Sequence, residues 1–512
     1  MTERRTSLDA DCSEHEEISL REIDKQDTDE YIHPEEVNKQ VQESIITELR
    51  HNQATRFKFI LSFCATFAYS MLGWCKGQNG PAFLDILYIS GSDLEEGSAF
   101  MTSYSTGCAI GSIIGGTVYS KVNRYLLLVV ALLIYSLTRA FIPWCVLYEL
   151  MITVHAVHGI SGGIISVVMT STAVSIWGAT ARGRVYLNIF LVSDGAAGLI
   201  SPIATSPFLL PRSIDADKRS DPWNISNNIA KTNMFSMKGN ISSTIHNPQS
   251  NLTNTEIPTS NVYIAYALSA GLVFLSTLPF IVMCCKPSTH DTKGRAHEQS
   301  HYIGNLSVTA KRIQLVNVGL FSTFYMSVNF VFTGYLPAFC VQHLRWTKIF
   351  GAWLTSELFL AMLGGRLFGA YISHFLKPIK LLAFSTVLHV MGQAGLSVSG
   401  FFVADEGIWI SVCVIGIAWG LMWPSLLSWT NENLISVRGK VTAFIMLMGF
   451  LGTLLSPLLF GYMMEEISPI WFCFLNLGYS CITVINVIFM FVYTRFLKRK
   501  SRKDRNNKHL NS

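Results

Sequence analysis

The sequence predicts an all-α polytopic membrane protein whose twelve spanning helices form two similar six-helix bundles. Composition, the recurrence of long apolar runs and a match of the chain with itself predict this fold. Of the 512 residues, 50% are hydrophobic and only 14% are charged, whereas about a quarter of an average soluble domain is charged. A chain of this composition has too few polar side chains to cover its surface in water.

Apolar runs of about twenty residues or more recur along the chain, and each is long enough to cross about 30 Å of bilayer hydrocarbon as a helix. Because a backbone inside lipid must satisfy its own hydrogen bonds, each run is predicted to be helical. The twelve predicted spans are residues 57–89, 100–119, 126–148, 150–177, 186–210, 262–285, 313–341, 349–375, 379–403, 408–429, 441–464 and 469–496.

Polar stretches divide these spans into predicted regions. Residues 1–55 form an acidic cytosolic tail that lacks the apolar core of a signal peptide and is expected to be disordered. Residues 56–285 and 313–496 form the two six-helix bundles, joined by a cytosolic linker at 286–312. Residues 497–512 form a basic cytosolic tail, which we interpret as an anchor against anionic lipid rather than a nucleic-acid site.

The charges of the loops predict that the amino terminus is cytosolic. Lysine and arginine concentrate in the loops that this orientation places inside, whereas the short outer loops contain only Arg345 and Lys348. Acidic residues gather in the outer loops. This bias follows the positive-inside rule, and an even number of spans returns the carboxyl terminus to the cytosol.

The loop at 211–261 lies outside in this orientation and carries three N-glycosylation sequons. Their acceptors are Asn224, Asn240 and Asn251, and sequons of this kind indicate a surface loop on the secretory route. A further sequon at Asn305 falls in the inner linker and is expected to remain unmodified. We therefore expect an integral membrane glycoprotein, with the plasma membrane as its default location.

The second half of the chain repeats features of the first half at a nearly constant offset. Small residues are common where membrane helices pack closely, but four matches in register are hard to obtain by chance. The matched sets are Gly111 and Gly115 with Gly365 and Gly369, Gly159 and Gly163 with Gly416 and Gly420, Ser201-Pro202 with Ser456-Pro457, and Pro81-Ala82-Phe83 with Pro337-Ala338-Phe339. They relate spans 1, 2, 4 and 5 to spans 7, 8, 10 and 11, as a parallel duplication of six helices does.

Four short segments carry a resemblance to a known family: 80–85 (GPAFLD), 111–116 (GSIIGG), 176–178 (IWG) and 365–367 (GRL). In these segments the chain resembles the major facilitator superfamily, and within it the branch of the sodium-dependent glucose transporters. The resemblance implies alternating access, a solute site between the halves lined by spans 1, 4, 7 and 10, and spans 5 and 8 that face each other. Relatives often carry acids where this chain has Ser166 and Asn329, so no coupling carboxylate is expected there.

Ionisable residues inside the predicted spans are candidates for gating or ion coupling, because a charge in the bilayer is costly. Asp194 in span 5 and Arg366 in span 8 lie at similar depths, and we predict that they pair across the halves in one access state. A permanent structural pair is the alternative. Asp194 is also the candidate carboxylate for coupling to Na⁺ or H⁺, with uncoupled diffusion left open. Lys76 and Glu357 are predicted to meet near the outer side, unless Lys76 snorkels to the interface.

Polar and aromatic residues on spans 1, 4, 7 and 10 are the candidates for solute binding. They are Trp74, Gln78, Asn79, Ser166, Thr170, Tyr325, Asn329, Thr333, Trp419 and Trp423. Amides, hydroxyls and ring faces suit a monosaccharide such as glucose, whereas an anion fits poorly because these four spans lack a central basic residue. The alternatives are packing or interfacial tryptophans, and hydroxyls bonded to their own helix.

The chain shows no pattern of an enzyme, and no cofactor is expected beyond a coupling ion. His155 and His158 lie one turn apart, but no carboxylate or cysteine completes a metal set, so hydrogen-bonded histidines are expected. We expect a lipid-embedded functional monomer that binds a sugar-like solute and no nucleic acid. The alternatives are a carrier for another neutral polar metabolite, or a facilitator-fold receptor or partner subunit that does not transport.

Overall fold

A computed structural model describes residues 52–119, 121–177, 181–210, 260–285, 308–373, 375–435 and 440–510. Residues 1–61 and 62–512 form separate units, and the packing described below is that of the second unit. Most of the predicted acidic tail, of the loop at 211–261 and of the linker at 286–312 lies outside the described residues. The predictions for those regions therefore stay predictions.

The described residues form twelve helices of eighteen residues or more, which confirms the predicted all-α fold of twelve spans. The helices are α3 (Gln53–Ser90), α4 (Leu94–Val118), α5 (Arg124–Phe141), α6 (Tyr148–Trp177), α7 (Ala181–Thr205), α10 (Val262–Cys285), α11 (Val308–Gln342), α12 (Lys348–Ile372), α13 (Pro378–Phe402), α14 (Asp405–Asn433), α15 (Lys440–Tyr462) and α16 (Trp471–Leu510). Short turns of other helix types follow three of them, at Ile142–Trp144, Ser206–Phe208 and Met463–Ile467.

Ten of these helices are long and apolar enough to cross a membrane by themselves. The two exceptions, α4 and α12, are each 25 residues long, which is sufficient length. Helix α4 is rich in glycine, serine and threonine, and α12 contains Glu357 and Arg366 as well as Lys348 at its start. Their low hydropathy agrees with their position, because both helices lie where the two bundles meet.

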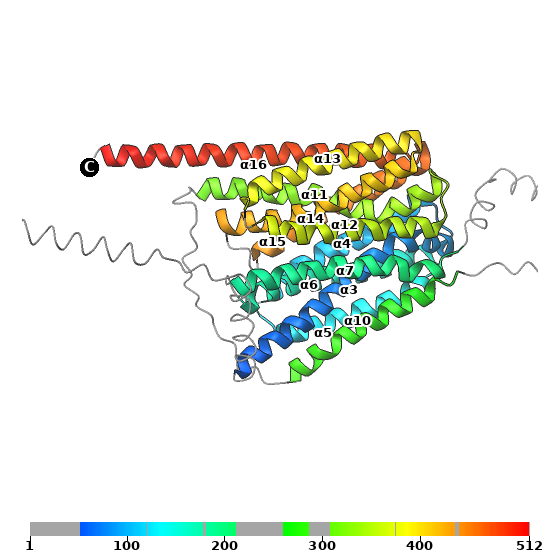
Figure 1. Ribbon diagram of the computed structural model, residues 1–512. Coiled ribbons are helices and arrows are strands. Elements are labelled where there is room, and N and C mark those ends of the chain that lie inside the picture. Colours follow the sequence, from blue (N-terminus) through cyan, green and yellow to red (C-terminus); the bar gives the residue numbers. More distant parts are fainter. Residues whose placement is uncertain are drawn as a thin grey trace, which may run out of the picture. The chain divides into compact units, whose positions relative to one another are not determined.

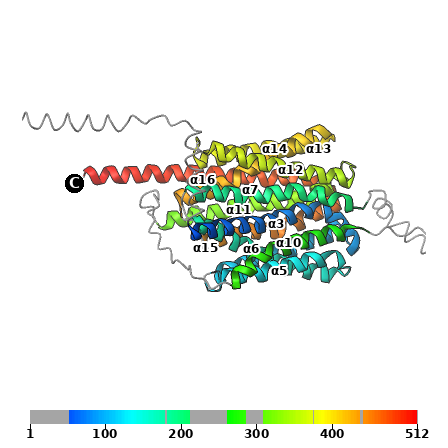
Figure 2. The same cartoon turned by 60° about the horizontal axis from the view of Figure 1, so that its bottom comes forward.

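Helix pairs inside the first bundle recur inside the second. Helix α4 packs on α6 as α12 packs on α14, α5 packs on α6 as α13 packs on α14, and α5 packs on α10 as α13 packs on α16. In Figures 1 and 2, α5 and α10 lie together on one side of this unit, and α13 lies on the opposite side. The recurring pairs confirm two six-helix bundles related by a parallel repeat.

The repeated glycines are the points where these paired helices touch. A Cβ placed on Gly111 of α4 would collide with the backbone of Ile160 on α6, and one on Gly365 of α12 would collide with the backbone of Ile417 on α14. Close backbone approach of this kind is the use that membrane helices make of small residues. The glycines that repeat in the sequence therefore mark corresponding helix contacts in the two bundles.

Several helix pairs connect the bundles to each other, and two of them are extensive. Helix α7 packs on α12, and α4 packs on α15, which confirms the expectation that spans 5 and 8 face each other. Small residues allow the second contact: Gly116 of α4 lies against Ala443, and Gly461 of α15 lies against Ser98. The interface between the bundles is thus built by the same close packing as each bundle.

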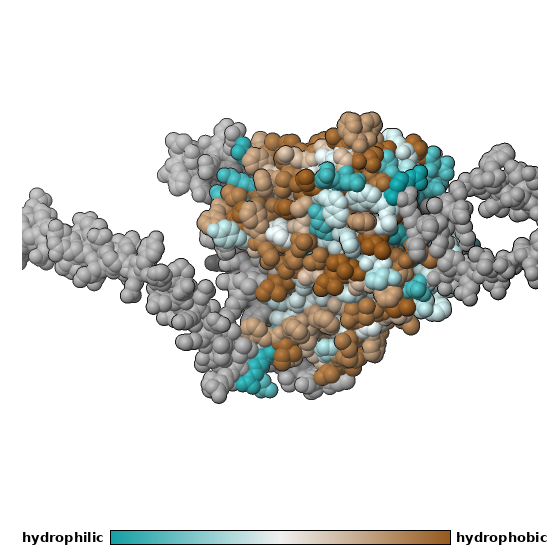
Figure 3. Space-filling view, turned by 45° about the vertical axis from the view of Figure 1, so that its right-hand side comes forward, coloured by the Kyte–Doolittle hydropathy of each residue, from teal (hydrophilic) through white to brown (hydrophobic). Residues whose placement is uncertain are grey.

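Large apolar side chains cover much of the outside of the helices. Leu137, Leu455, Phe401 and Ile485 are among the exposed ones, and the face in Figure 3 is largely apolar. Water would not tolerate so much exposed hydrocarbon, whereas lipid would. The last helix also continues further than predicted, because α16 extends to Leu510 instead of ending at Phe496.

Substitution of Gly365 tests the packing of α12 on α14. Gly365→Leu is expected to lower the melting temperature of the purified protein, since overfilling a close contact costs about 1–3 kcal/mol. Gly364→Leu is the matched control, because a Cβ at Gly364 meets nothing within 4 Å. Size-exclusion chromatography after heating measures both variants, and equal stability of the two would contradict the described contact.

Candidate functional site

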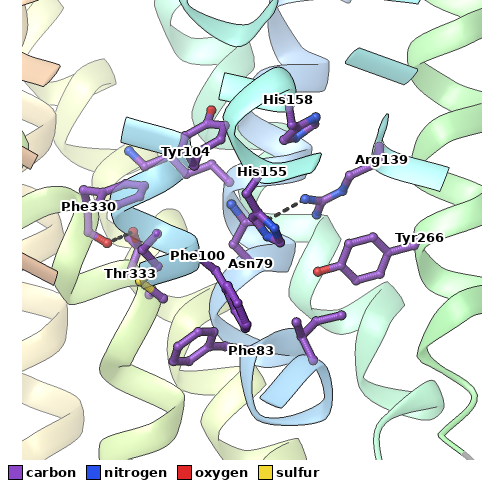
Figure 4. Close-up of a pocket in the computed structure, with 14 residues that line it drawn as sticks. Asn79, Phe83, Phe100, Tyr104, Arg139, His155, His158, Tyr266, Phe330 and Thr333 are labelled. Atoms are coloured by element: carbon purple, nitrogen blue, oxygen red, sulfur yellow. Dashed lines mark hydrogen bonds between the residues drawn. The ribbon is translucent and has the colours of Figure 1, made fainter. Parts of the chain in front are cut away.

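A pocket lies between the two bundles, lined by five helices of the first bundle and by α11 of the second. Its lining residues are Lys76, Asn79, Phe83 and Ile86 of α3, Phe100, Met101 and Tyr104 of α4, Arg139 of α5, His155 and His158 of α6, Tyr266 of α10, and Phe330, Thr333 and Gly334 of α11. Figure 4 shows Arg139 reaching Asn79, while Phe330 and Thr333 lie on the other side of the pocket. Half of its lining residues carry aromatic rings when the two histidines are counted, and its charged members are basic.

Arg139 is the most deeply buried charge of the pocket, at 1% exposed. Its two terminal nitrogens donate to the side-chain oxygens of Asn79 at 2.7 Å and Gln78 at 2.6 Å, and to the backbone oxygen of Cys75 at 3.2 Å. Its guanidinium carbon lies 4.3 Å from the ring centroid of Tyr266, within cation–π range. The acceptors are all neutral, so they orient the guanidinium without cancelling its charge.

Lys76 also reaches the pocket, which corrects two expectations from the sequence. Its ammonium donates to the side-chain oxygen of Asn329 on α11, instead of meeting Glu357 or snorkelling to an interface. The sequence placed Lys76 too close to the outer end of its helix. Fourteen residues of α3 follow Lys76, the last of them Ser90, which is about 21 Å of helix. The premise that span 1 lacks a central basic residue is therefore wrong.

The two histidines of α6 are hydrogen-bonded, as the sequence predicted. The Nδ1 of His155 lies 2.8 Å from the backbone oxygen of Met151, and the Nδ1 of His158 lies 2.9 Å from the hydroxyl of Thr138. A backbone oxygen only accepts, so Nδ1 of His155 carries the proton. The Thr138 hydroxyl already donates to the backbone oxygen of Ile134. It therefore accepts from Nδ1 of His158, so Nδ1 carries the proton in this ring too.

Asp194 and Arg366 meet across the bundles. An Nη of Arg366 lies 3.4 Å from a carboxylate oxygen of Asp194, and the other Nη donates to the backbone oxygen of Leu191. The side chain of Asp194 is 14% exposed and that of Arg366 is 8% exposed. The structure thus brings together the two residues that the sequence proposed as a pair between α7 and α12.

A second ion pair between the bundles, Asp85 with Lys348, was missed in the sequence. Lys348 Nζ lies 2.8 Å from Asp85, and the side chains are 3% and 0% exposed. Asp85 also accepts from the Leu210 backbone at 3.0 Å and from the Ser260 hydroxyl at 2.6 Å. Asp85 stood in the segment that carries the family resemblance, but Lys348 was counted as a loop residue, so the two were not connected.

Glu357 does not join either pair. It lies nine residues before Arg366 on α12, which is two and a half turns, so the two side chains point to opposite sides of the helix. Because Arg366 faces α7, Glu357 faces away from it, and its Oε2 has no hydrogen-bond partner in the part of the chain that the structure describes. The predicted contact of Glu357 with Lys76 is therefore not formed.

The predicted solute residues divide into three groups. Asn79 and Thr333 line the pocket, and Gln78 and Asn329 hold its two basic side chains. The remaining six are not among the residues that line the pocket. Trp74 donates to Ser269 on α10, Trp419 packs on Phe332, Tyr325 stacks on Trp423, Ser166 bonds to its own helix, and the hydroxyl of Thr170 has no partner among the described residues. The sequons at Asn224, Asn240 and Asn251 lie outside the described residues.

A pocket and two ion pairs lie between the two six-helix bundles, an arrangement typical of the major facilitator fold. Residues 250–457 match the family model of the Major Facilitator Superfamily, in agreement with the resemblance seen in the sequence. The mouse sodium-dependent glucose transporter 1A is 22% identical over 401 residues, covering 77% of this chain and 87% of that protein. Major facilitator superfamily domain-containing protein 4A of Xenopus tropicalis is 20% identical over 484 residues, covering 84% and 92%.

Solved structures share the fold. A D-xylose–proton symporter superposes with a TM-score of 0.60 at 14% identity, covering 84% of this chain and 97% of that one. The fucose:proton symporter of E. coli superposes with a TM-score of 0.55 at 13% identity, covering 85% and 99%. Family and fold together point to a transporter and not to an enzyme.

Disruption of the pair between Asp85 and Lys348 is expected to destabilise the protein. Asp85→Asn leaves the Lys348 ammonium buried without its carboxylate, and breaking a buried pair in this way costs about 3–5 kcal/mol. Thermal unfolding of the purified protein measures the loss, with Glu357→Gln as the control, since this carboxylate forms no ion pair among the described residues. The double variant Asp85→Asn with Lys348→Met should lose less than the sum of its single variants, and simple additivity would contradict the coupling.

Proposed function

We propose that this protein is a secondary transporter that moves a small sugar-like solute across the membrane by alternating access. The observation that carries the proposal is the pocket between the bundles, to which both bundles contribute lining residues. A site at such an interface opens to either side when one bundle rocks against the other. The protein acts as a monomer in this proposal, because one chain supplies both bundles.

The pocket suits a sugar in its mixture of ring faces and polar groups. Phe83, Phe100 and Phe330 offer apolar faces to ring carbons, and Asn79 and Thr333 offer polar atoms to hydroxyls. Relatives and fold neighbours whose names specify glucose, xylose or fucose support the same solute class. The cavity of about 50 Å³ holds only a few waters, so side chains or bundles move to admit a sugar.

The two ion pairs provide the contacts that alternating access would make and break. Lys348 and Arg366 are eighteen residues apart on α12, so the two pairs lie about 27 Å apart along this helix. Lys76 and Ile86 of α3 both line the pocket, and Asp85 lies on the same helix. We propose that the pair at Asp85 closes the outer side and that the pair at Asp194 controls the inner side.

Asp194 is also our candidate for ion coupling. Its carboxylate is close to a basic group that competes with any bound Na⁺ or H⁺, so ion binding would weaken the contact with Arg366. Relatives named as sodium-dependent transporters support coupling to sodium. Uptake of labelled hexose into vesicles, measured with and without a sodium gradient and a pH gradient, tests the function and its coupling, and binding without flux would indicate a receptor.

Cross-linking distinguishes a switching pair from a permanent one. The variant Asp194→Cys with Arg366→Cys is expected to cross-link, and the cross-linked protein should lose at least tenfold in uptake, since the bundles can no longer separate there. Reduction should restore uptake to the level of the uncross-linked variant. Full transport by the cross-linked protein would show that the pair is permanent and would remove the gating role.

Glycosylation tests the proposed orientation, with both termini in the cytosol and the protein at the plasma membrane. Asn224→Gln, Asn240→Gln and Asn251→Gln are each expected to remove one glycan, seen as a shift in mass that treatment with an amidase abolishes. Asn305→Gln is the control and should change nothing, because its sequon is predicted to face the cytosol. Glycan at Asn305 would reverse the orientation.

A further inference from the structure

The charge of the pocket is not the charge that a neutral sugar requires. Its lining contains two basic side chains, Lys76 and Arg139, and no aspartate or glutamate. The other two basic groups in the interior, Lys348 and Arg366, are each paired with a carboxylate. Lys76 and Arg139 meet neutral acceptors in the part of the chain that the structure describes.

Neighbouring carboxylates do not cancel these two charges. Asp194 attracts the ammonium of Lys76 electrostatically, and Arg366 repels it. Asp194 and Arg366 form an ion pair, so the attraction and the repulsion oppose each other. Asp85 is held by Lys348, by the Leu210 amide and by the Ser260 hydroxyl. The pocket lining can therefore carry up to two positive charges in a low-dielectric interior, where an uncompensated charge costs several kcal/mol.

Both basic side chains line the same pocket, so an anion bound there is attracted by each of them. Asn79, which fixes a terminal nitrogen of Arg139 at 2.7 Å, lies one turn of α3 from Lys76, and side chains three residues apart on a helix are neighbours. Nε of Arg139 is buried and has no acceptor among the described residues. A carboxylate has two oxygens, so it can accept from both basic groups and cancel charge that amides leave intact.

The two histidines complete the site with acceptors. Since Nδ1 of His155 and of His158 is the donor in each ring, Nε2 of each neutral ring offers a lone pair. The Nε2 of His158 is buried without a partner among the described residues. Hydroxyl groups of a solute can donate to these nitrogens, whereas an aliphatic acid without hydroxyls would leave them unused.

We infer that the solute of this transporter is a carboxylate-bearing sugar, a hexuronate or a closely related polyhydroxy acid, held by its carboxylate at Lys76 and Arg139. This inference rests on the proposed transport function and names the solute class of the same site. The hydroxyls face His155 and His158, and the sugar ring lies among the aromatic side chains of the pocket. Neutral hexoses bind more weakly because they leave the two positive charges uncompensated.

Competition in reconstituted vesicles tests this inference with glucuronate and glucose as probes. Labelled glucuronate is expected to enter wild-type vesicles, and unlabelled glucuronate should inhibit any glucose uptake at least tenfold more strongly than unlabelled glucose does. Lys76→Gln and Arg139→Gln should each reduce this preference at least tenfold, and Arg139→Lys should retain more of it. Lys377→Gln is the matched control, because it removes an exposed lysine remote from the pocket lining.

The outcomes separate the inference from the function on which it rests. Uptake of glucose that glucuronate does not inhibit, with unchanged selectivity in Lys76→Gln, overturns the inference and leaves sugar transport standing. Uptake of neither probe overturns the proposed transport of sugar-like solutes. If Arg139→Gln does not fold, the decision falls to Lys76→Gln and to thermal unfolding of the wild-type protein, which glucuronate but not glucose should shift upward.

Discussion

Buried charge must be compensated in an interior that water does not reach, and this constraint organises the contact between the two bundles. Aspartates on α3 and α7 meet basic residues on α12. Each pair joins one bundle to the other, so neither bundle alone satisfies its own charges. Because a carboxylate or a basic group left single there costs several kcal/mol, the ion pairs favour the assembled form, and their rupture needs a compensating event such as ion or solute binding.

Close helix packing sets the distances within which those charges act. Gly73 and Gly77 of α3 place its backbone against Asp194 and Gly198 of α7, so α3 and α7 approach without side chains between them. Lys76 lies between these glycines and is therefore carried toward the interface. Small residues thus help to position the basic side of the pocket, and packing and electrostatics are parts of one arrangement.

Part of the site was predictable because a charge inside a long apolar run is unusual in any context. Asp194 and Arg366 stood out in this way, and the structure brings them together. Arg139 met the same criterion and was overlooked, although it lies well inside the predicted span at 126–148. Lys76 was noticed but placed at the wrong depth, and Trp74 and Trp419 were assigned to the solute although they pack within a bundle. Side-chain chemistry alone does not say which face of a helix a residue occupies.

The sequence by itself determined the number of helices and their repeat in two bundles, because apolar length and the spacing of small residues are local properties of the chain. The facing of α7 and α12 was expected only from the resemblance to the superfamily. Only the tertiary structure decided which charges meet, that Asp85 pairs with Lys348 and that Lys76 and Arg139 share one pocket. Those outcomes depend on the rotation and depth of each helix relative to its neighbours. Such relations are fixed by packing between segments that are far apart in the chain, and no single segment contains them.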